Sequence, residues 1–319
     1  MATDARADRE PEERGESEDE KPTDAPHPAF EGYAAEVPPQ AAVGAPGKDG
    51  VLELRFAPSE GGTRLVYDYA TVPFHISGTL GHDPHPDVET VFLQSPTGGI
   101  AQGDRHDVTI DVEDGALAHV STQSSTKVQS MDHNYAGAET TLSVGRNAHL
   151  DYVPEPTILH ADSRYVQDLD VSLAPGATAV VSDIVVPGRL ARGEAFAFER
   201  YLSRVRATGP GELLFEDTTH LVPDESDPHA PGVLGEYTVY GTTFVLAPDR
   251  DAAGLSDRLH EAVAEGEARA GASALPNGAG VGIRALGDRA ETVQATLQAG
   301  WDCARRELID APAPSGRKY

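Results

Sequence analysis

The sequence is poor in several residue types, and each shortage excludes a class of protein. Its 319 residues include a single cysteine, Cys303, so one chain has neither a disulfide framework nor a metal site built only of thiolates. No run of about 18 apolar residues is present, which excludes a membrane-spanning helix. The first residues, "MATDARADREPEERGESEDE", lack the apolar core of a secretory signal. We therefore expect a cytoplasmic protein.

Lysine is nearly absent, and acidic residues dominate the charge. Only Lys21, Lys48, Lys127 and Lys318 occur, and 52 acidic residues face 25 basic ones, for a formal net charge of −27. Such a surface repels itself at low ionic strength, whereas molar salt shortens the Debye length to about 3 Å and removes that repulsion. This composition is typical of a salt-adapted, halophilic organism. It also argues against nucleic acid as a partner, because phosphate binding needs basic side chains.

The chain begins with a segment of different composition. Residues 1–49 are rich in Glu, Asp, Pro and Ala and have almost no large aliphatic side chains, which predicts a disordered acidic tail. From Val51 the apolar residues alternate with a period of two. The runs "VLELRF" and "TRLVYDY", separated by "APSEGG", predict a β-hairpin.

The same pattern of strand, turn and strand recurs along the chain. It is found in "DVTIDVEDGALAHVSTQ", "TTLSVGRNAHLDYVPEP", "LDVSLAPGATAVVSDIVVPGR" and "RVRATGPGELLFEDTTHL". Each turn carries a residue that tolerates positive φ, and the repeat is about thirty residues long, from Ala116 to Ala148 to Ala177. We therefore expect a mainly β body of stacked hairpins, as in a β-solenoid or a large sandwich.

The pattern changes near the C-terminus. Residues 235–310 predict a β-α-β-α segment with two helices, one from about Ser256 and one from about Ala290. The residues 311–319, "APAPSGRKY", contain prolines that prevent a helix and are expected to form a mobile tail. Residues 50–319 would thus form a single domain.

A glycine-rich loop, "LQSPTGGIAQGDR" at residues 93–105, does not fit nucleotide binding. A phosphate-binding loop needs Gly-Lys-Ser/Thr at its end, whereas Gly103 is followed by Asp104. A carboxylate at that position repels phosphate. The glycines allow tight turns, and Asp104 is either a hydrogen-bond acceptor within the loop or a functional carboxylate.

Several motifs together resemble one family. "PTGGIAQGD", "TQSSTKV", "ATAVVSDIVVPGRLARGEAF" and a final Trp-containing helix ending in "RRELI" are similar to the UreD (UreH) family of urease accessory proteins, from about Val51 to the C-terminus. The resemblance implies a non-enzymatic scaffold, mainly β, that docks on urease apoprotein. It also implies UreF and the GTPase UreG as partners, no permanently bound cofactor, and nickel in transit through a polar internal passage.

Polar residues at matching offsets from the turns are candidates for that passage. Thr122, Gln123, Glu155, Asp183 and Glu216 fall five to seven residues into the second strand of successive hairpins, which in stacked hairpins would place them in a polar seam or in a solvent-facing row.

Two further residues join the candidate set. Lys127, the one lysine between Lys48 and Lys318, either pairs within the seam or extends to solvent. Asp183 lies in an apolar run, where an acid is either paired or functional. With Asp104 added from the resemblance, Asp104, Asp183 and Glu216 are expected to be weak nickel contacts along the route.

Two other functions stay open. A β-solenoid carbohydrate-active enzyme would use Asp183 and Glu216 as acid and base, although its sugar-stacking aromatics would be few, since aromatics make up 6% of the chain. A purely structural repeat protein would leave the seam without a purpose. Arg317 and Lys318 form a basic end on an acidic protein, and the resemblance suggests UreF as the partner of this end.

Overall fold

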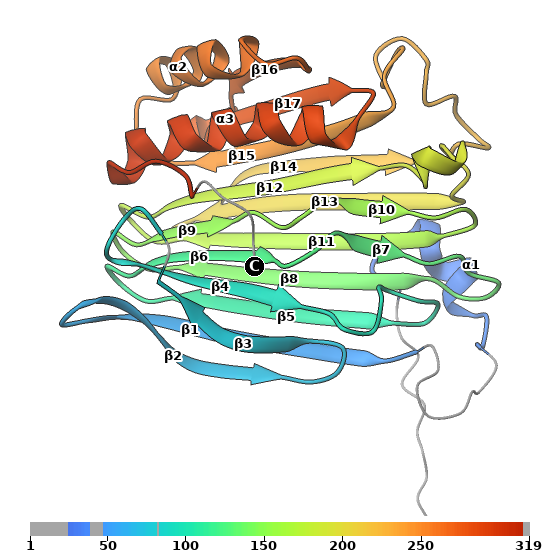
Figure 1. Ribbon diagram of the computed structural model, residues 1–319, viewed down its shortest axis with the longest axis horizontal. Helices are drawn as coiled ribbons and strands as arrows, with labels where there is room; N and C mark the ends of the chain where they lie inside the picture. The colour runs from blue at the N-terminus through green and yellow to red at the C-terminus, as the bar shows by residue number, and fades with distance from the viewer. Residues whose placement is uncertain (1–24, 39–46, 82, 315–319) are drawn as a thin grey trace, which may run out of the picture.

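The computed structural model describes residues 25–38, 47–81 and 83–314. They form two facing β-sheets, with two helices against one end of the stack (Figure 1). Sheet A has seven strands in the order β14-β13-β11-β8-β5-β1-β2: β1 (Asp49–Ser59), β2 (Gly62–Ala70), β5 (Arg105–Val112), β8 (Ala136–Val144), β11 (Arg164–Leu173), β13 (Arg200–Gly209) and β14 (Glu212–Leu221).

Sheet B has ten strands. Eight follow the order β16-β17-β15-β12-β9-β6-β4-β3, and the short β10 and β7 continue from β12. Their bounds are β3 (His75–Leu80), β4 (Val88–Gln94), β6 (Leu117–Thr122), β7 (Thr126–Val128), β9 (His149–Tyr152), β10 (Thr157–Leu159), β12 (Thr178–Val186), β15 (Val239–Leu246), β16 (Arg269–Ala274) and β17 (Gly280–Gly287). The helices are α1 (Glu31–Ala34), α2 (Ala252–Ala264) and α3 (Ala290–Ile309), with 3₁₀ turns η1 (Pro28–Phe30), η2 (Leu190–Arg192) and η3 (Pro276–Gly278).

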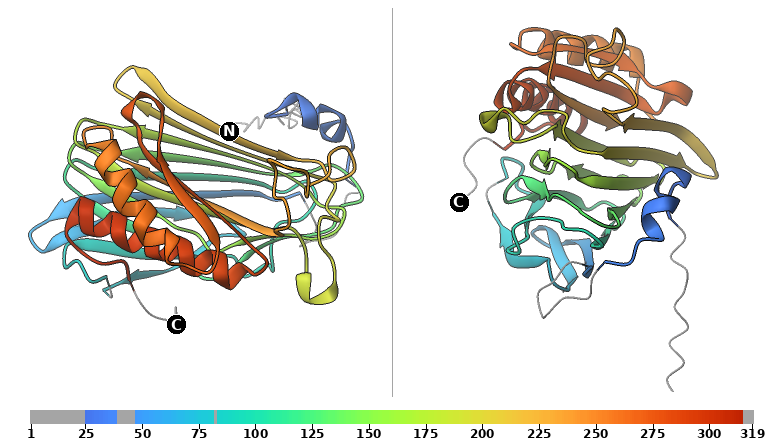
Figure 2. Two further views of the ribbon diagram at one scale, coloured as in Figure 1. Left: turned by 90° about the horizontal axis from the view of Figure 1, so that it is seen from above. Right: turned by 90° about the vertical axis from the view of Figure 1, so that its right-hand side faces the viewer.

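The central strands stack as the coils of a solenoid. In each coil a strand of sheet A turns into a strand of sheet B, as β5 into β6, β8 into β9 and β11 into β12, and equivalent strands pair in parallel. The two layers are visible in the right-hand view of Figure 2. The predicted stacked, mainly β body is therefore confirmed.

The connection within each central repeat differs from the prediction. β1–β2 and β13–β14 are antiparallel hairpins, as predicted, but the three repeats between them are arches whose two strands lie in different sheets. A glycine or asparagine with positive φ fits either connection, and alternating apolar residues fit either pairing. The arches are preferred because they turn the apolar faces of both strands toward one interior.

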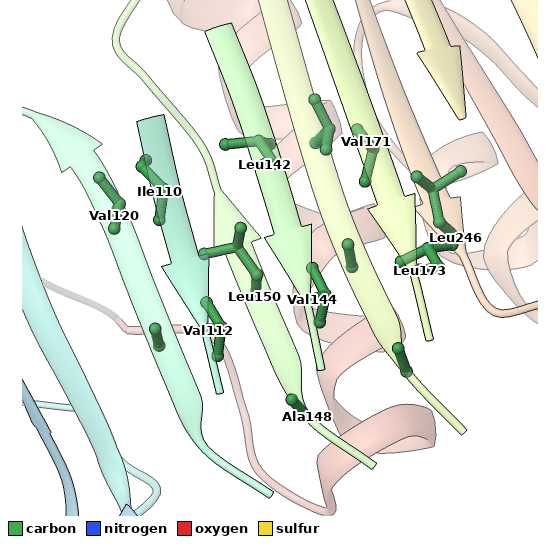
Figure 3. Close-up of a cluster of buried hydrophobic side chains, with 14 of the residues drawn as sticks. Ile110, Val112, Val120, Leu142, Val144, Ala148, Leu150, Val171, Leu173 and Leu246 are labelled. Carbon is green, nitrogen blue, oxygen red and sulfur yellow. The ribbon is translucent and has the colours of Figure 1, made fainter. Parts of the chain in front are cut away.

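That interior is filled by aliphatic side chains from both sheets (Figure 3). Ile110, Leu142 and Val171 of sheet A face Val120 and Leu150 of sheet B, and all five are at most 1% exposed. Burying a side chain of this size stabilises the fold by roughly 1.5–3 kcal/mol, so the stacked rows carry most of the stability of the body.

Helices α2 and α3 cover the outer face of one end of sheet B (Figure 1). Strand β12 is consequently apolar on both faces, since Val180 and Ile184 pack toward the helices and Val181 packs toward sheet A. The largely apolar run "TAVVSDIVV", interrupted by Ser182 and Asp183, is typical of such a strand.

The predicted C-terminal order is extended by one strand. β16 precedes β17, so the order after β15 is α-β-β-α, and the two predicted helices are both present. Helix α3 begins at Ala290, as predicted, whereas α2 begins at Ala252 because the Asp251 side chain caps it by accepting the Ala253 amide.

Both predicted tails contain packed segments. Residues 25–38 lie on the outer face of sheet A, where Phe30 is fully buried against Tyr135, Val166 and Leu202, although residues 1–49 were predicted to be disordered. The single Phe in that acidic segment provides the anchor. Residues 311–314 fold back on α3, where the Ala313 amide donates to Asp302 at 2.9 Å, so the predicted mobility does not extend to them. Residues 1–24, 39–46 and 315–319 lie outside the described residues.

Candidate functional site: a polar cavity between the sheets

A cavity of about 180 Å³ lies between the two sheets. It separates the aliphatic core shown in Figure 3 from a second apolar cluster that contains Tyr165, Val185 and Tyr201. Side chains of both sheets form its wall, and many are polar. The polar residues used below are His106, Thr140, Gln167 and Ser203 from sheet A and Thr122, Lys127, Tyr152 and Asp183 from sheet B, with Glu155 between β9 and β10.

Asp183 of β12 is an acid in the wall of the cavity. Its Oδ2 accepts hydrogen bonds from Gln167 Nε2 at 2.7 Å and from Tyr201 Oη at 3.0 Å. Burial raises the pKa of this carboxyl above its ordinary value, and the hydrogen bonds from Tyr201 and Gln167 offset only part of that effect. Asp183 forms no ion pair within the described residues. An acid held by neutral donors at a cavity wall is available to a mobile cation.

Tyrosines surround this carboxylate. The pKa values of Tyr152, Tyr165, Tyr201 and Tyr240 are all raised, chiefly by burial and in part by the charge of Asp183. Their phenols therefore stay protonated and keep their O–H donors at physiological pH. The surroundings of Asp183 are polar without carrying a second negative charge.

The rim of the cavity forms where sheet B is interrupted. β6 stops before β7 and β9 stops before β10, and Pro154 and Pro156 flank Glu155 in the second gap. The Glu155 amide donates to Thr122 Oγ1 at 2.8 Å, and Gln294 of α3 donates to the Glu155 carboxylate at 3.2 Å. A proline cannot donate to the sheet ladder, so this sequence opens the sheet beside the cavity.

The glycine-rich loop forms another part of the wall. Gly98, Gly99 and Ile100 line the cavity, and the Ile100 amide donates to the Lys127 carbonyl at 2.8 Å. Gly99 has φ +127°, and a Cβ added there would lie 2.2 Å from the Lys127 oxygen. Glycine is required because the two backbones touch.

His106 lies on the inner face of β5 in the same row as Gln167. The pairing of β5 with β8 and of β8 with β11 aligns His106, Ala138 and Gln167 on adjacent strands. His106 is 7% exposed and contacts Phe74 edge to face, with ring centroids 4.9 Å apart. Burial, with a smaller effect from Lys48, lowers its pKa to about 4, so the imidazole is neutral at physiological pH.

Four of the predicted residues lie together at this cavity. Thr122, Lys127, Glu155 and Asp183 all line it, and Lys127 is exposed at the rim. The similar offsets of Thr122, Glu155 and Asp183 from the turns were informative because the arches place the second strand of each coil in the same sheet.

Three predicted residues lie elsewhere. Asp104 is 2% exposed and does not line the cavity, because its carboxylate accepts the amides of Gly47, Lys48 and Ala101 at 3.0, 2.9 and 2.8 Å. It fastens the glycine loop to the start of β1. Gln123 is exposed and does not contribute to the wall.

Glu216 is exposed on edge strand β14, opposite Arg206. It was misplaced because β13 and β14 form a hairpin within sheet A, so the offset from the turn no longer leads into sheet B. Asp183 and Glu216 consequently cannot act on one glycosidic bond, and the carbohydrate-active enzyme is excluded in that form. Arg317 and Lys318 lie outside the described residues.

Sequence reasoning missed a buried ionic cluster that attaches α3 to sheet B. Arg305 is 0% exposed and donates to Asp151 at 2.7 Å and to Asp83 at 2.5 Å, and Trp301 Nε1 donates to Asp151 at 2.7 Å. Burial alone would raise the pKa of Asp151, but His149, 3.2 Å away, and Arg305 hold it at about 2. The Trp and Arg of the last helix were visible in the sequence, and their distant partners were not.

Gln167, Tyr201 and Ser203 were also missed. They lie on β11 and β13, the sheet A strands that face Asp183, and alternation alone does not distinguish them from other inward residues. Within the described ranges, no three His, Cys, Asp or Glu side chains gather in a geometry that could hold a metal ion. No described helix is long and apolar enough to cross a membrane.

The sequence is similar to known proteins along most of its length. Residues 48–318 match the family model described as UreD urease accessory protein. The urease accessory protein UreD of the halophilic archaeon Haloarcula marismortui is 78% identical over 296 residues, which cover 93% of this chain and 99% of that protein. The corresponding protein of Natronomonas pharaonis is 45% identical over 91% of this chain and 98% of its own, and UreD 2 of Streptomyces griseus is 35% identical over 89% and 98%.

Proposed function

Because this chain belongs to the UreD family of urease accessory proteins, we propose that it is a non-enzymatic maturation factor that delivers nickel to urease through the cavity beside Asp183. Family membership supports the role in urease maturation. The route for nickel is supported by one observation above the others: an acid without an ion-pair partner among the described residues lies in the wall of a polar cavity inside the β body.

The chemistry of the wall suits a metal in transit. Nickel binds oxygen and imidazole donors, and a conduit has to release the ion to the final site. Asp183 supplies attraction, while Gln167 and Tyr201 already share its Oδ2 and weaken its hold on a cation. Nickel is therefore cargo, and no permanent cofactor is part of the proposal.

The partners in this proposal are UreF, the GTPase UreG and the urease structural subunits. The protein acts in the cytoplasm, where urease apoprotein is made, and neither nucleic acid nor a membrane takes part. The acidic surface is adaptation to salt, so docking depends on local features rather than on overall charge.

The test is urease activation by Asp183→Asn in cells that express urease, UreF and UreG. Asn keeps the size of the side chain and an acceptor for Tyr201 but loses the charge, so the variant should assemble normally while the purified urease contains less nickel. Glu216→Gln removes an exposed acid of the same charge and should leave nickel content unchanged. Full nickel loading of urease with the Asp183 variant would contradict the proposal.

A further inference from the structure

The cavity is large compared with the few ligands it offers to a metal. Its volume of about 180 Å³ equals that of about six water molecules, at roughly 30 Å³ for each molecule of the liquid. A divalent ion that gives up its hydration shell needs several nitrogen or oxygen ligands in its place. Among the described residues no three His, Cys, Asp or Glu side chains gather to hold a metal ion, so the wall has too few strong ligands to replace that shell.

The charged and imidazole groups of the wall are also far apart. Glu155 and Lys127 lie at the rim, and Asp168, although adjacent to the cavity, is bound by Arg204 through two hydrogen bonds of 2.9 Å. His106 is two strands from Gln167, and neighbouring strands are about 4.8 Å apart, so it is roughly 10 Å from the Asp183 end. One ion cannot contact His106 and Asp183 directly at the same time.

The wall is instead suited to accept hydrogen bonds from water. Gln167 Nε2 lies 2.7, 2.9 and 3.0 Å from Asp183, Tyr201 and Ser203, so its two N–H groups are directed at these residues and its amide oxygen is left as an acceptor. Ser203 and Thr140, which both carry a hydroxyl group, line the same cavity. Water bound to a dication is a strong donor, and the carboxylate of Asp183 adds attraction across one layer of water.

We propose that nickel crosses this cavity as its aqua ion, held through its water ligands by Asp183, Gln167 and Ser203 rather than by direct coordination. This inference rests on the proposed nickel route and specifies the form of the cargo. Contacts through water are weaker than direct bonds and favour release. Such contacts distinguish hydrated ions only by charge and size, so hydrated Mg²⁺, a dication of similar size, competes for the site. The partner protein that loads the cavity must therefore select nickel.

The test uses hexaamminecobalt(III), whose ligands do not exchange and which therefore binds only through its outer shell. Crystals of the full chain grown in molar KCl are soaked with this ion, and its affinity in solution is measured by NMR. The expected result is cobalt anomalous density in the cavity beside Asp183, with nuclear Overhauser effects from the ammine protons to Gln167. Asp183→Asn should weaken binding about tenfold or more, Glu216→Gln should not, and Mg²⁺ should displace the ion.

Nickel X-ray absorption separates this inference from the route itself. One outcome is nickel in the cavity with imidazole or carboxylate as a direct ligand, and with no competition from hexaamminecobalt(III). That outcome would contradict transport as the aqua ion and leave the nickel route intact. Absence of both ions from the cavity would also overturn it. The route is tested independently by the nickel content of urease matured with Asp183→Asn.

Discussion

The Arg305 guanidinium lies 2.7 Å from the Asp151 carboxylate, and both side chains are 0% exposed. The pair joins the last helix, α3, to β9 in the middle of sheet B. Asp83 and Trp301 complete the contacts, so the C-terminal helix is attached to the solenoid by charge as well as by apolar packing.

Loss of Arg305 should therefore be costly. Arg305→Met leaves Asp151 and Asp83 buried without their cation, and removing one partner of a buried pair typically costs about 3–5 kcal/mol. Arg306→Met is the matched control, because Arg306 pairs with Asp302 on the exposed surface of the same helix, where loss of an ion pair has little effect on stability. Denaturant unfolding of both variants measures the difference. Equal midpoints would show that the buried pair contributes nothing special.

The charge of Asp183 should make stability depend on pH. Its pKa is raised in the folded protein, so the folded state binds this proton more tightly than the unfolded chain, whose pKa is near 3.9. The contribution of this proton to the free energy of unfolding is complete below the pKa of the unfolded chain. It is lost as the pH rises through the pKa of the folded protein. Asp183→Asn cannot ionise, so its free energy of unfolding relative to the wild type should increase from pH 3.5 to pH 7.5. A constant difference across that range would show that the carboxylate is not penalised by burial.

Gly99→Ala should destabilise the glycine loop more than Gly98→Ala. Both glycines have positive φ, +127° and +85°, but only at Gly99 would the new Cβ meet a backbone oxygen, that of Lys127. Gly98→Ala should cost about 1 kcal/mol from backbone strain, and Gly99→Ala should cost about 1–3 kcal/mol or more. Thermal melts of the two variants provide the comparison, and a larger loss for Gly98→Ala would contradict the contact.

Folding should require salt. With a formal net charge of −27, the surface repels itself when KCl falls from molar concentration to about 0.1 M, where the Debye length returns to about 10 Å. We expect the circular-dichroism melting temperature to fall continuously over that range. Equal melting temperatures at both concentrations would indicate that the acids are neutralised within the fold.

The basic C-terminal end should act in UreF binding. Deleting residues 315–319 removes Arg317 and Lys318 but keeps Ala311 and Ala313, which are 5% exposed against the protein. This variant should keep its melting temperature and lose co-purification with UreF. Deleting residues 311–319 should lose both, because it also removes the packed alanines. Retention of UreF by the shorter deletion would exclude the role of the basic end.

The sequence by itself predicted the repeated strands of the body, and its composition predicted a dependence on salt. Alternation with a period of two and turn residues every thirty positions predict strands that bury one face, and the net charge predicts that folding depends on salt. Thr122, Glu155 and Asp183 were found because equal offsets in a repeat become equal heights in a stack. The Trp and Arg of the last helix could also be recognised, because they belong to a short motif of neighbouring residues.

Only the tertiary structure decided which sheet each second strand joins. A turn with positive φ permits a hairpin or an arch, and the choice depends on the burial of both strands against residues far away in the sequence. That choice brought Asp183 into a cavity opposite Gln167 and Tyr201, and it left Glu216 on an exposed edge. Asp104 was identified as a site residue and is structural, because the amides that occupy it come from Gly47 and Lys48, more than fifty residues earlier in the chain. Long-range contacts of this kind leave no pattern among neighbouring residues, so they cannot be predicted from the sequence alone.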